Sequence, residues 1–238
     1  MMMSLILVCL MLTFIMSNSF NTMSTKTTSF NTMSKLYMGP TIYGAQQTRS
    51  PLVNWYLIEN SIPFVQKPPR PSNHPFGQAP FLTDDGGVEV FESGAILLYL
   101  ADKYVSKDAI ERASWTKWVV FANSELEELC FGPGFSGSLL ERSDKKALNI
   151  LEDRLSKSNW LVNNQFSVAD VAVASYLNYV PLFFPRVNLK NRPNLVKYML
   201  ASAERKAFGE AFGEDHAELI KRKSEEWLGS KAKPFGIF

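Results

Sequence analysis

The chain has 238 residues, of which 46% are apolar and 20% are charged. It is therefore long and apolar enough to fold as one large domain or two small ones. Its 25 basic and 23 acidic residues leave a formal charge of +2, which gives no general reason to expect a nucleic acid or a polyanionic partner. Two cysteines exclude a disulfide scaffold, and two histidines are too few for a histidine-based metal site.

Residues 1–34 differ in composition from the rest of the chain. Leu5 to Met16 is an apolar run that is too short to span a bilayer, and it is typical of the hydrophobic region of a secretory signal, although no basic region precedes it. Ser17 to Ser34 is rich in Ser, Thr, Asn and Met and holds no acidic residue. That composition is typical of a transit peptide.

A signal followed by a transit-like segment is similar to the bipartite plastid presequence of algae with complex plastids. Phe20, just after the apolar run, fits that pattern. We therefore expect import into a plastid, with secretion as one alternative and a cytoplasmic protein starting at Met33 as another. The mature chain is expected to begin near Lys35 and to have no stable membrane insertion.

The first half of the mature chain shows strand and helix signals in alternation. Lys35–Met38 is predicted to be a short strand, and Ile62–Val65 is predicted to be the second strand. Between them, Ser50 stands at an N-cap position and Pro51 at the first helical position, which predicts a helix over Leu52–Glu59.

A hairpin and a helix are predicted over residues 81–104. Asp84–Gly87 is a strong turn signal, and Val88–Phe91 has the alternation of a return strand that would pair with the strand at Phe81. Ser93 then stands at an N-cap position, and the helix that follows is predicted to close at Tyr104.

Two features of this region suggest a ligand site. Pro80 lies at the entry to a strand, where it donates no ladder hydrogen bond and leaves neighbouring backbone groups free to pair with a peptide. Glu92 and Ser93 lie at a helix N-terminus, where the amide dipoles attract a carboxylate and the Glu side chain accepts from an ammonium. Together they fit a zwitterionic amino-acid head group.

The second half of the chain is predicted to be all helical. Helices are expected over Ala109–Leu129, Leu139–Leu155, Pro193–Ala207 and Glu214–Leu228, with a tail over 230–238. In the first of these helices Trp115, Trp118 and Phe121 either line a pocket or, as is usual for such spacing, belong to the core.

Ser167 and Asp170 have the spacing of a capping box, which predicts the start of another helix there. Phe166 and Val171 have the spacing of the accompanying hydrophobic staple. We therefore assign Asp170 a role in folding rather than in catalysis.

The segments GQAPFL, FESGAILLYLADKY and FSVADVAVASYL, in this order and spacing, resemble the soluble glutathione transferases. Cyanobacterial and chloroplast members look similar in the last two segments. The resemblance implies an α/β thioredoxin-like domain over 35–105 that is followed by an all-α domain over 109–229. It also implies glutathione as co-substrate without a metal, a small electrophilic substrate as used in detoxification, and a homodimer.

The resemblance also implies the binding residues. Pro80 would be the cis-proline, the backbone of Ala79 would pair with the cysteinyl part of glutathione, and Glu92 and Ser93 would hold its γ-glutamyl end. Most members of the family have a longer segment with a second helix where this chain has Gln66–Asn73, whose prolines exclude a helix. Lys67, Arg70 or His74 are the candidates for holding the glycine end instead, and the alternative is that they only form a solvated loop, as is common for exposed charges.

In this family the loop before the first helix supplies the group that stabilises the glutathione thiolate. Thr48 is the first candidate and Ser50 the second, although a Ser before Pro is often only a helix cap. Lowering a thiol pKa from about 8.5 by about two units takes roughly 2.7 kcal/mol of preferential stabilisation of the anion. A hydroxyl donor and a helix N-terminus together supply energies of that order.

The expected activity is therefore attack of the glutathione thiolate on a small electrophile. The loop holds no cysteine, which argues against the thiol-transferase and dehydroascorbate reductase branches. Two alternatives stay open, namely a non-catalytic binding module with the same fold, and glutathione-dependent isomerase, dehalogenase or peroxidase chemistry.

Overall fold

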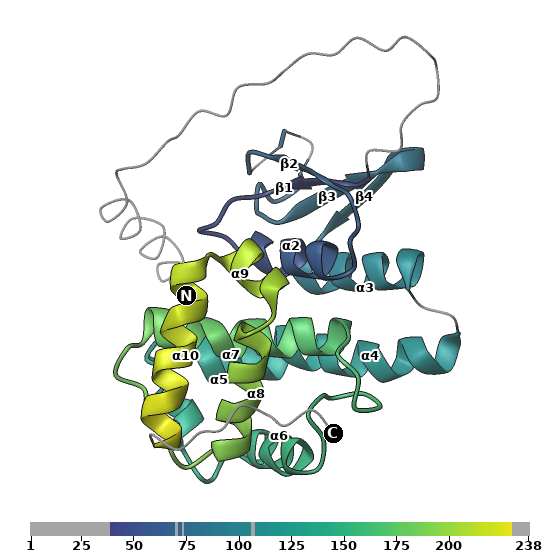
Figure 1. Cartoon of the computed structure of the whole chain (residues 1–238). Coiled ribbons are helices and arrows are strands. Elements are labelled where there is room, and N and C mark those ends of the chain that lie inside the picture. The colour runs from purple at the N-terminus through teal and green to yellow at the C-terminus, as the bar shows by residue number, and fades with distance from the viewer. Residues whose placement is uncertain (1–38, 70, 73, 106–107, 230–238) are drawn as a thin grey trace. The chain divides into compact units, whose positions relative to one another are not determined.

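The computed structural model describes residues 39–69, 71–72, 74–105 and 108–229 (Figure 1), and these residues belong to one compact unit. The expected presequence over 1–34, the expected strand Lys35–Met38, and the tail over 230–238 lie outside the described residues. Within the described ranges, no helix is long and apolar enough to cross a membrane.

A four-stranded mixed sheet forms the first layer, in the order β2-β1-β3-β4. β1 (Thr41–Tyr43) pairs in parallel with β2 (Val65–Lys67) and antiparallel with β3 (Phe81–Asp84). β3 and β4 (Val88–Phe91) form the predicted hairpin, because the Asp-Gly-Gly turn reverses the chain between them. The hairpin prediction is confirmed.

Two helices accompany the sheet, as Figure 1 shows: α2 (Ser50–Glu59) and α3 (Ser93–Tyr104). A mixed four-stranded sheet with helices on its face is the thioredoxin-like arrangement that the sequence predicted. Between β2 and β3 none of the described residues is helical, in keeping with the prolines of that loop.

The strand predicted at Ile62–Val65 lies further along the chain than expected. The strand predicted at Ile62–Val65 is instead β2, because Pro63 cannot donate to the ladder and pairing starts at Val65. Gly39 and Pro40 precede β1, and the Pro40 carbonyl accepts from the backbone of Val65 at 3.0 Å. A Cβ on Gly39, whose φ is +73°, would lie 1.7 Å from the carbonyl oxygen of Pro63, so only glycine fits this close approach.

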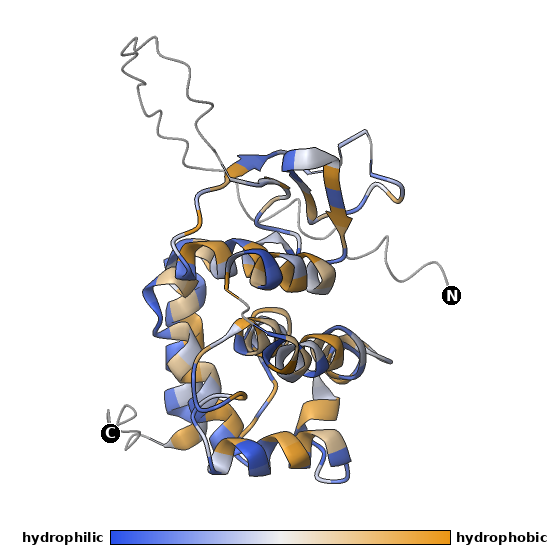
Figure 2. Cartoon of the chain, turned by 90° about the vertical axis from the view of Figure 1, so that its right-hand side faces the viewer, coloured by the Kyte–Doolittle hydropathy of each residue, from blue (hydrophilic) through white to orange (hydrophobic). Residues whose placement is uncertain are grey.

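The helical layer is built around α7 (Val168–Phe183). Every residue of α7 up to Pro181 is buried, as is typical of a helix that neighbouring helices surround. α4 (Ala109–Phe121) packs along it and continues through a π-helical segment (Ala122–Leu126) into α5 (Glu127–Phe131), where one helix was predicted to end at Leu129. Figure 2 shows hydrophobic and hydrophilic residues alternating along these helices.

The helix predicted over Leu139–Leu155 is two elements. A 3-10 turn (Ser138–Glu141) precedes α6 (Lys146–Ser156). The buried guanidinium of Arg192 donates to the Leu140 carbonyl at 2.7 Å and to the Arg142 carbonyl at 2.5 Å. These carbonyls therefore bond to a distant side chain rather than to the next turn of a helix.

The last helices differ from the prediction in one place. α8 (Pro193–Ala203) ends earlier than the predicted Ala207, and α9 (Lys206–Phe212) starts a new direction and packs on α2. α10 (Glu214–Leu228) has the predicted bounds. One of its faces is buried, so α10 is amphipathic rather than exposed throughout.

Candidate active site

The strand register brings the predicted binding residues to one edge of the sheet. Phe81 of β3 pairs with Tyr43 of β1 on one side and with Phe91 of β4 on the other. The loop that follows Tyr43, the Ala79–Pro80 pair before Phe81 and the Glu92–Ser93 pair after Phe91 therefore all leave the sheet at the same edge. The Ala79–Pro80 peptide bond is cis, as the resemblance implied.

The start of α3 has no side-chain cap. Glu92 occupies the N-cap position with φ 68°, a left-handed conformation that non-glycine residues rarely adopt, and its side chain makes no capping bond. Ser93 is the first helical residue, so the prediction that it caps the helix was wrong. Among the described residues none accepts from the backbone N–H groups of Ser93, Gly94 and Ala95. These donors, at the positive end of the helix dipole, suit a carboxylate.

The Ser93 hydroxyl faces the helical layer instead of the backbone. It donates to Oδ1 of Asn123 at 3.1 Å, and the same oxygen accepts from the Tyr176 hydroxyl at 2.9 Å. Nδ2 of Asn123 donates to the Val119 carbonyl at 2.8 Å. A Cβ on Gly94 would lie 2.7 Å from Nδ2 of Asn123, in the π-helical segment, so a larger residue here would displace the Asn123 amide.

The two candidate hydroxyls of the first loop contact each other. Oγ1 of Thr48 lies 2.7 Å from Oγ of Ser50 and donates to the Ala45 carbonyl at 2.7 Å. The Ser50 backbone N–H donates to Oγ1 of Thr48 at 3.1 Å, while Arg49 is the N-cap of α2 and makes no side-chain capping bond. Ser50 is fully buried, whereas Thr48 is half-buried. Of the two residues, only Thr48 is partly exposed to solvent.

Arg49, between these hydroxyls, reaches the helical layer. Its guanidinium forms an ion pair with Glu127 and donates to the Tyr176 hydroxyl at 3.2 Å. Burial lowers the pKa of Arg49, but Tyr176 and Glu127 outweigh this effect and raise it. Burial raises the pKa of Tyr176 to about 12, with Arg49 opposing. Tyr176 is therefore a neutral hydroxyl at physiological pH.

Other residues of the helical layer also hold the first loop. Nε2 of Gln46 donates to the carbonyls of Ala211 at 3.2 Å and Phe212 at 2.6 Å, at the end of α9. The Tyr179 hydroxyl donates to the backbone carbonyl of Thr48 at 3.4 Å. The position of the loop therefore depends on the helical layer as well as on its own sequence.

The candidates for the glycine end of glutathione differ in their solvent exposure and in the contacts that they already make. Lys67 pairs with Tyr43 in the ladder, at the edge of the sheet where the site lies, and its side chain is exposed. His74 is buried, its Nδ1 accepts from the Phe76 backbone at 2.9 Å, and its ring packs on Phe81. Arg70 lies outside the described residues. The described residues contain no group of His, Cys, Asp and Glu that could hold a metal ion.

The aromatic residues near the site are not those considered from the sequence. Trp115 is buried, and Trp118 packs edge-on against Phe121 at 5.8 Å. An aromatic group at the ends of α5 and α7 lies beside Tyr176 and Tyr179. The ring centroids of Tyr176 and Phe131 are 6.4 Å apart, and those of Tyr179 and Phe183 are 6.0 Å apart. The aromatic group consists of Phe131, Phe135, Phe183 and Phe184.

Sequence reasoning did not identify Asn123, Glu127 or Tyr176, nor the contacts of Arg49 with the helical layer. Glu127 lies 78 residues from Arg49 of the first loop, and Tyr176 lies 53 residues from Asn123, so no local motif joins the loop to these residues. The one signal in the sequence is that Asn123 and Glu127 interrupt the apolar pattern of a helix with polar residues, which alone is common on any exposed helix face.

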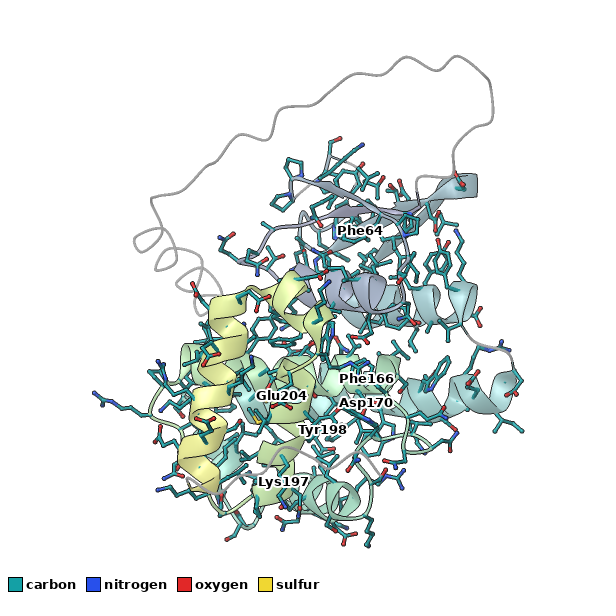
Figure 3. All side chains as sticks on the ribbon, viewed as in Figure 1. Phe64, Phe166, Asp170, Lys197, Tyr198 and Glu204 are labelled. Atoms are coloured by element: carbon teal, nitrogen blue, oxygen red, sulfur yellow. The ribbon has the colours of Figure 1, made fainter. Side chains whose placement is uncertain are left out.

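A second polar cluster has its own partners. The carboxylate of Asp170 accepts from the backbone of Leu161 at 2.9 Å, from Ser167 and from the Tyr198 hydroxyl at 3.2 Å. The capping box of Ser167 and Asp170 is present, which confirms that prediction. Figure 3 shows Asp170, Tyr198 and Phe166 together in the helical layer.

Two family descriptions match this chain, one in each layer. "Glutathione S-transferase, N-terminal domain" matches residues 53–102, and "Glutathione S-transferase, C-terminal domain" matches residues 140–206. They match in the order in which the sheet and the helices occur. In both layers the chain is therefore similar to the glutathione S-transferase family.

Similar proteins of this family come from distant organisms. A glutathione S-transferase domain-containing protein of Dictyostelium discoideum is 31% identical over 157 residues, which is 56% of this chain and 60% of that protein. The glutathione S-transferase GstB of Escherichia coli K12 is 29% identical over 153 residues, which is 56% of this chain and 73% of GstB. The chain spans 60%, 56% and 59% of the length of the first curated relatives, less than two thirds of each.

Solved structures of the family share the fold. Ure2p5 from Phanerochaete chrysosporium, cocrystallised with 1-(S-glutathionyl)-2,4-dinitrobenzene, has a TM-score of 0.61 and 22% sequence identity, and the match covers 77% of this chain and 96% of Ure2p5. At this identity the likeness shows the fold alone. The predicted fold, a thioredoxin-like layer followed by a helical one, is confirmed.

Proposed function

We propose that this protein is a glutathione transferase that binds glutathione at the shared edge of the sheet and uses its thiolate as a nucleophile. The observation that supports the proposal is the register, in which Tyr43, Phe81 and Phe91 are neighbours, so that the loop carrying Thr48, the Ala79–Pro80 pair and the Glu92–Ser93 pair all adjoin that edge. Structures of related transferases with bound glutathione support the choice of ligand.

The γ-glutamyl end of glutathione would bind at the start of α3. Its carboxylate would accept from the backbone N–H groups of Ser93, Gly94 and Ala95, which lack acceptors among the described residues. Its ammonium would pair with the exposed carboxylate of Glu92. The cysteinyl backbone would pair with Ala79, and Lys67 would hold the glycine carboxylate.

Thr48 would then stabilise the thiolate. Its hydroxyl donates to the Ala45 carbonyl in this structure, so it must turn toward the sulfur when glutathione binds. The N-terminus of α2, which follows at Ser50, adds its positive dipole end at the same place. In the reaction the sulfur forms a bond to the electrophilic carbon, and the leaving group departs with its electron pair.

The electrophile would lie against the aromatic group at the ends of α5 and α7. Phe135 is 42% exposed and Phe183 is 36% exposed, which leaves apolar surface beside Tyr176 and Tyr179. Such surface favours an apolar or aromatic electrophile over a charged one.

The second candidate is a glutathione-binding module without transferase turnover, or one with isomerase or peroxidase chemistry. The observation in its favour is that the hydroxyl protons of Thr48 and Ser50 have acceptors within the loop. If these bonds persist with glutathione bound, neither hydroxyl donates to the sulfur.

The first test is titration of glutathione into the chain from Lys35 onward, with ultraviolet detection of bound thiolate across pH, and then conjugation of 1-chloro-2,4-dinitrobenzene. We expect binding with thiolate at neutral pH. The double variant Thr48→Ala and Ser50→Ala should lose about 100-fold in kcat, since about two units of thiol pKa are at stake.

The matched control is the double variant Thr116→Ala and Ser114→Ala. These two hydroxyls belong to half-buried residues of α4 and donate to backbone carbonyls of the same helix. The control should keep full activity. Binding of glutathione without thiolate, or full activity in the Thr48 and Ser50 variant, would instead favour the second candidate.

We also infer two further properties, a homodimer and import into a plastid. For the dimer, the relevant surface is apolar: Phe76 is 66% exposed, and its ring packs edge-on against the exposed Phe91 with 5.4 Å between the ring centroids. A second copy would cover this surface. Sedimentation velocity on the same sample checks the dimer, and a fluorescent fusion to residues 1–34 checks the import.

A further inference from the structure

One hydroxyl of the helical layer contacts both halves of the proposed site. The Tyr176 hydroxyl accepts from the Arg49 guanidinium at 3.2 Å, and Arg49 lies between Thr48 and Ser50 in the sequence. It donates to Oδ1 of Asn123 at 2.9 Å, the oxygen that also accepts from Ser93 at 3.1 Å. Tyr176 therefore joins the thiolate half of the site to the γ-glutamyl half, through Arg49 on one side and Asn123 on the other.

The direction of these bonds follows from the chemistry of the groups. A guanidinium only donates, so the Tyr176 oxygen accepts from Arg49 and its single proton is free to go to Asn123. The amide of Asn123 cannot turn over, because its Nδ2 donates to the Val119 carbonyl. Oδ1 must then face Tyr176 and Ser93 together.

This arrangement determines what Ser93 offers to a ligand. Its hydroxyl proton is held by Asn123, so its backbone N–H and its oxygen lone pairs are what remain. The hydrogen bond from Tyr176 keeps Oδ1 of Asn123 in place to accept from the Ser93 hydroxyl. On the other side, Arg49 keeps its ion pair with Glu127 of α5, so the loop is tied to the helical layer at two atoms of one guanidinium.

We propose that Tyr176 is a positioning residue, which holds the first loop and the start of α3 in the relative geometry that binds glutathione and lowers the pKa of its thiol. This inference rests on the proposed function. Tyr176 itself need not touch glutathione, because it acts through Arg49 and Asn123. Its effect is therefore on affinity and on the thiol pKa together.

The test is the variant Tyr176→Phe in the otherwise unaltered chain, with glutathione as the probe. Phe keeps the ring against Phe131 and removes only the hydroxyl. We expect glutathione to bind about tenfold more weakly, since two hydrogen bonds that order the site are lost. We also expect the thiol pKa of bound glutathione to rise by about half a unit or more, read from the ultraviolet absorbance of thiolate against pH.

Tyr198→Phe is the matched control. It removes a buried tyrosine hydroxyl from the same helical layer, one that bonds to Asp170 rather than to the site. This variant should lose stability but keep the affinity for glutathione and the thiol pKa. A second variant, Arg49→Lys, keeps the positive charge but removes the guanidinium, whose separate N–H groups bond to Tyr176 and Glu127. It should shift the thiol pKa of bound glutathione in the same direction as Tyr176→Phe.

The outcomes separate this inference from the proposed function. If the unaltered chain does not bind glutathione, the proposed function fails and the inference falls with it. If the unaltered chain binds but Tyr176→Phe has the same affinity and thiol pKa, the inference alone is overturned. Equal losses in Tyr198→Phe would also overturn it, because they would show a general effect of destabilisation.

Discussion

The starts of α3 and α7 look alike in the sequence and differ in the structure. Each has a serine where a helix cap is expected, Ser93 in one and Ser167 in the other. At α7 the cap forms, since Ser167 and Asp170 complete a capping box. At α3 it does not form, and the serine hydroxyl bonds to Asn123 of another helix.

The difference lies in the first turn of each helix. α7 has Asp170 in its first turn, and that carboxylate takes up local donors. The first turn of α3 contains no acidic residue, and its N-cap residue Glu92 has a left-handed backbone. The donors of α7 are thus used for folding, whereas those of α3 remain for a ligand.

The largest effect that would sharpen this comparison is expected from Asp170→Ala. It leaves the Leu161 backbone, Ser167 and the Tyr198 hydroxyl without their acceptor in the core, and the free energy of unfolding should fall by about 4 kcal/mol. Urea unfolding measures the loss. Asp153→Ala, which removes an exposed ion pair with Lys157, should cost less than about 0.5 kcal/mol.

The next effect is a dependence on pH. Burial raises the pKa of Asp170 from its ordinary value of 3.8 to about 6, although hydrogen bonds from Leu161 and Ser167 oppose the shift. Because the folded state then binds the proton more tightly than the unfolded state, the part of the stability that comes from protonation of Asp170 is full below about pH 4 and is lost as the pH rises through 6.

Comparison with Asp170→Asn isolates this titration. From pH 4 to pH 7 the free energy of unfolding of the unaltered chain should fall relative to the Asn variant by up to about 3 kcal/mol. A constant difference across this range would mean that the donors around Asp170 offset its burial.

The smallest of these effects is expected at Ser93. Ser93→Ala removes a bond to Asn123, which keeps its bond from Tyr176, so stability should change by less than about 1 kcal/mol. Affinity for glutathione should fall about tenfold, because the start of α3 loses its contact with the helical layer.

Ser167→Ala is the matched control for Ser93→Ala. It should show the opposite result, a loss of about 1 kcal/mol in stability with unchanged affinity for glutathione. Calorimetric titration and urea unfolding of both variants decide the comparison. A loss of stability at Ser93 equal to that at Ser167 would remove the distinction between the two helix starts.

Much of the fold was predictable because its signals are local. The Asp-Gly-Gly turn, the capping box and the bounds of α10 each depend on residues within a few positions of one another, and all were predicted correctly. The predictions were wrong where a distant residue intervenes. Arg192 interrupts the helix predicted over Leu139–Leu155 by taking the carbonyls of Leu140 and Arg142.

The candidate site was likewise predictable only where its residues lie in local sequence patterns. Ala79, Pro80, Glu92 and Ser93 were identified from local patterns and from resemblance, and the structure brings them to one edge of the sheet, while their contacts with glutathione stay predictions. Residues that organise the site from the helical layer, such as Asn123 and Tyr176, gave no usable signal.

The sequence by itself determined where the chain turns and where most helices begin, since these depend on the conformational preferences of neighbouring residues. Only the tertiary structure decided which groups the Ser93 hydroxyl and the Arg49 guanidinium contact. A hydroxyl bonds to whatever acceptor the fold brings within about 3 Å. For Ser93 that acceptor is 30 residues away in the chain, and for Arg49 the partner Tyr176 is 127 residues away.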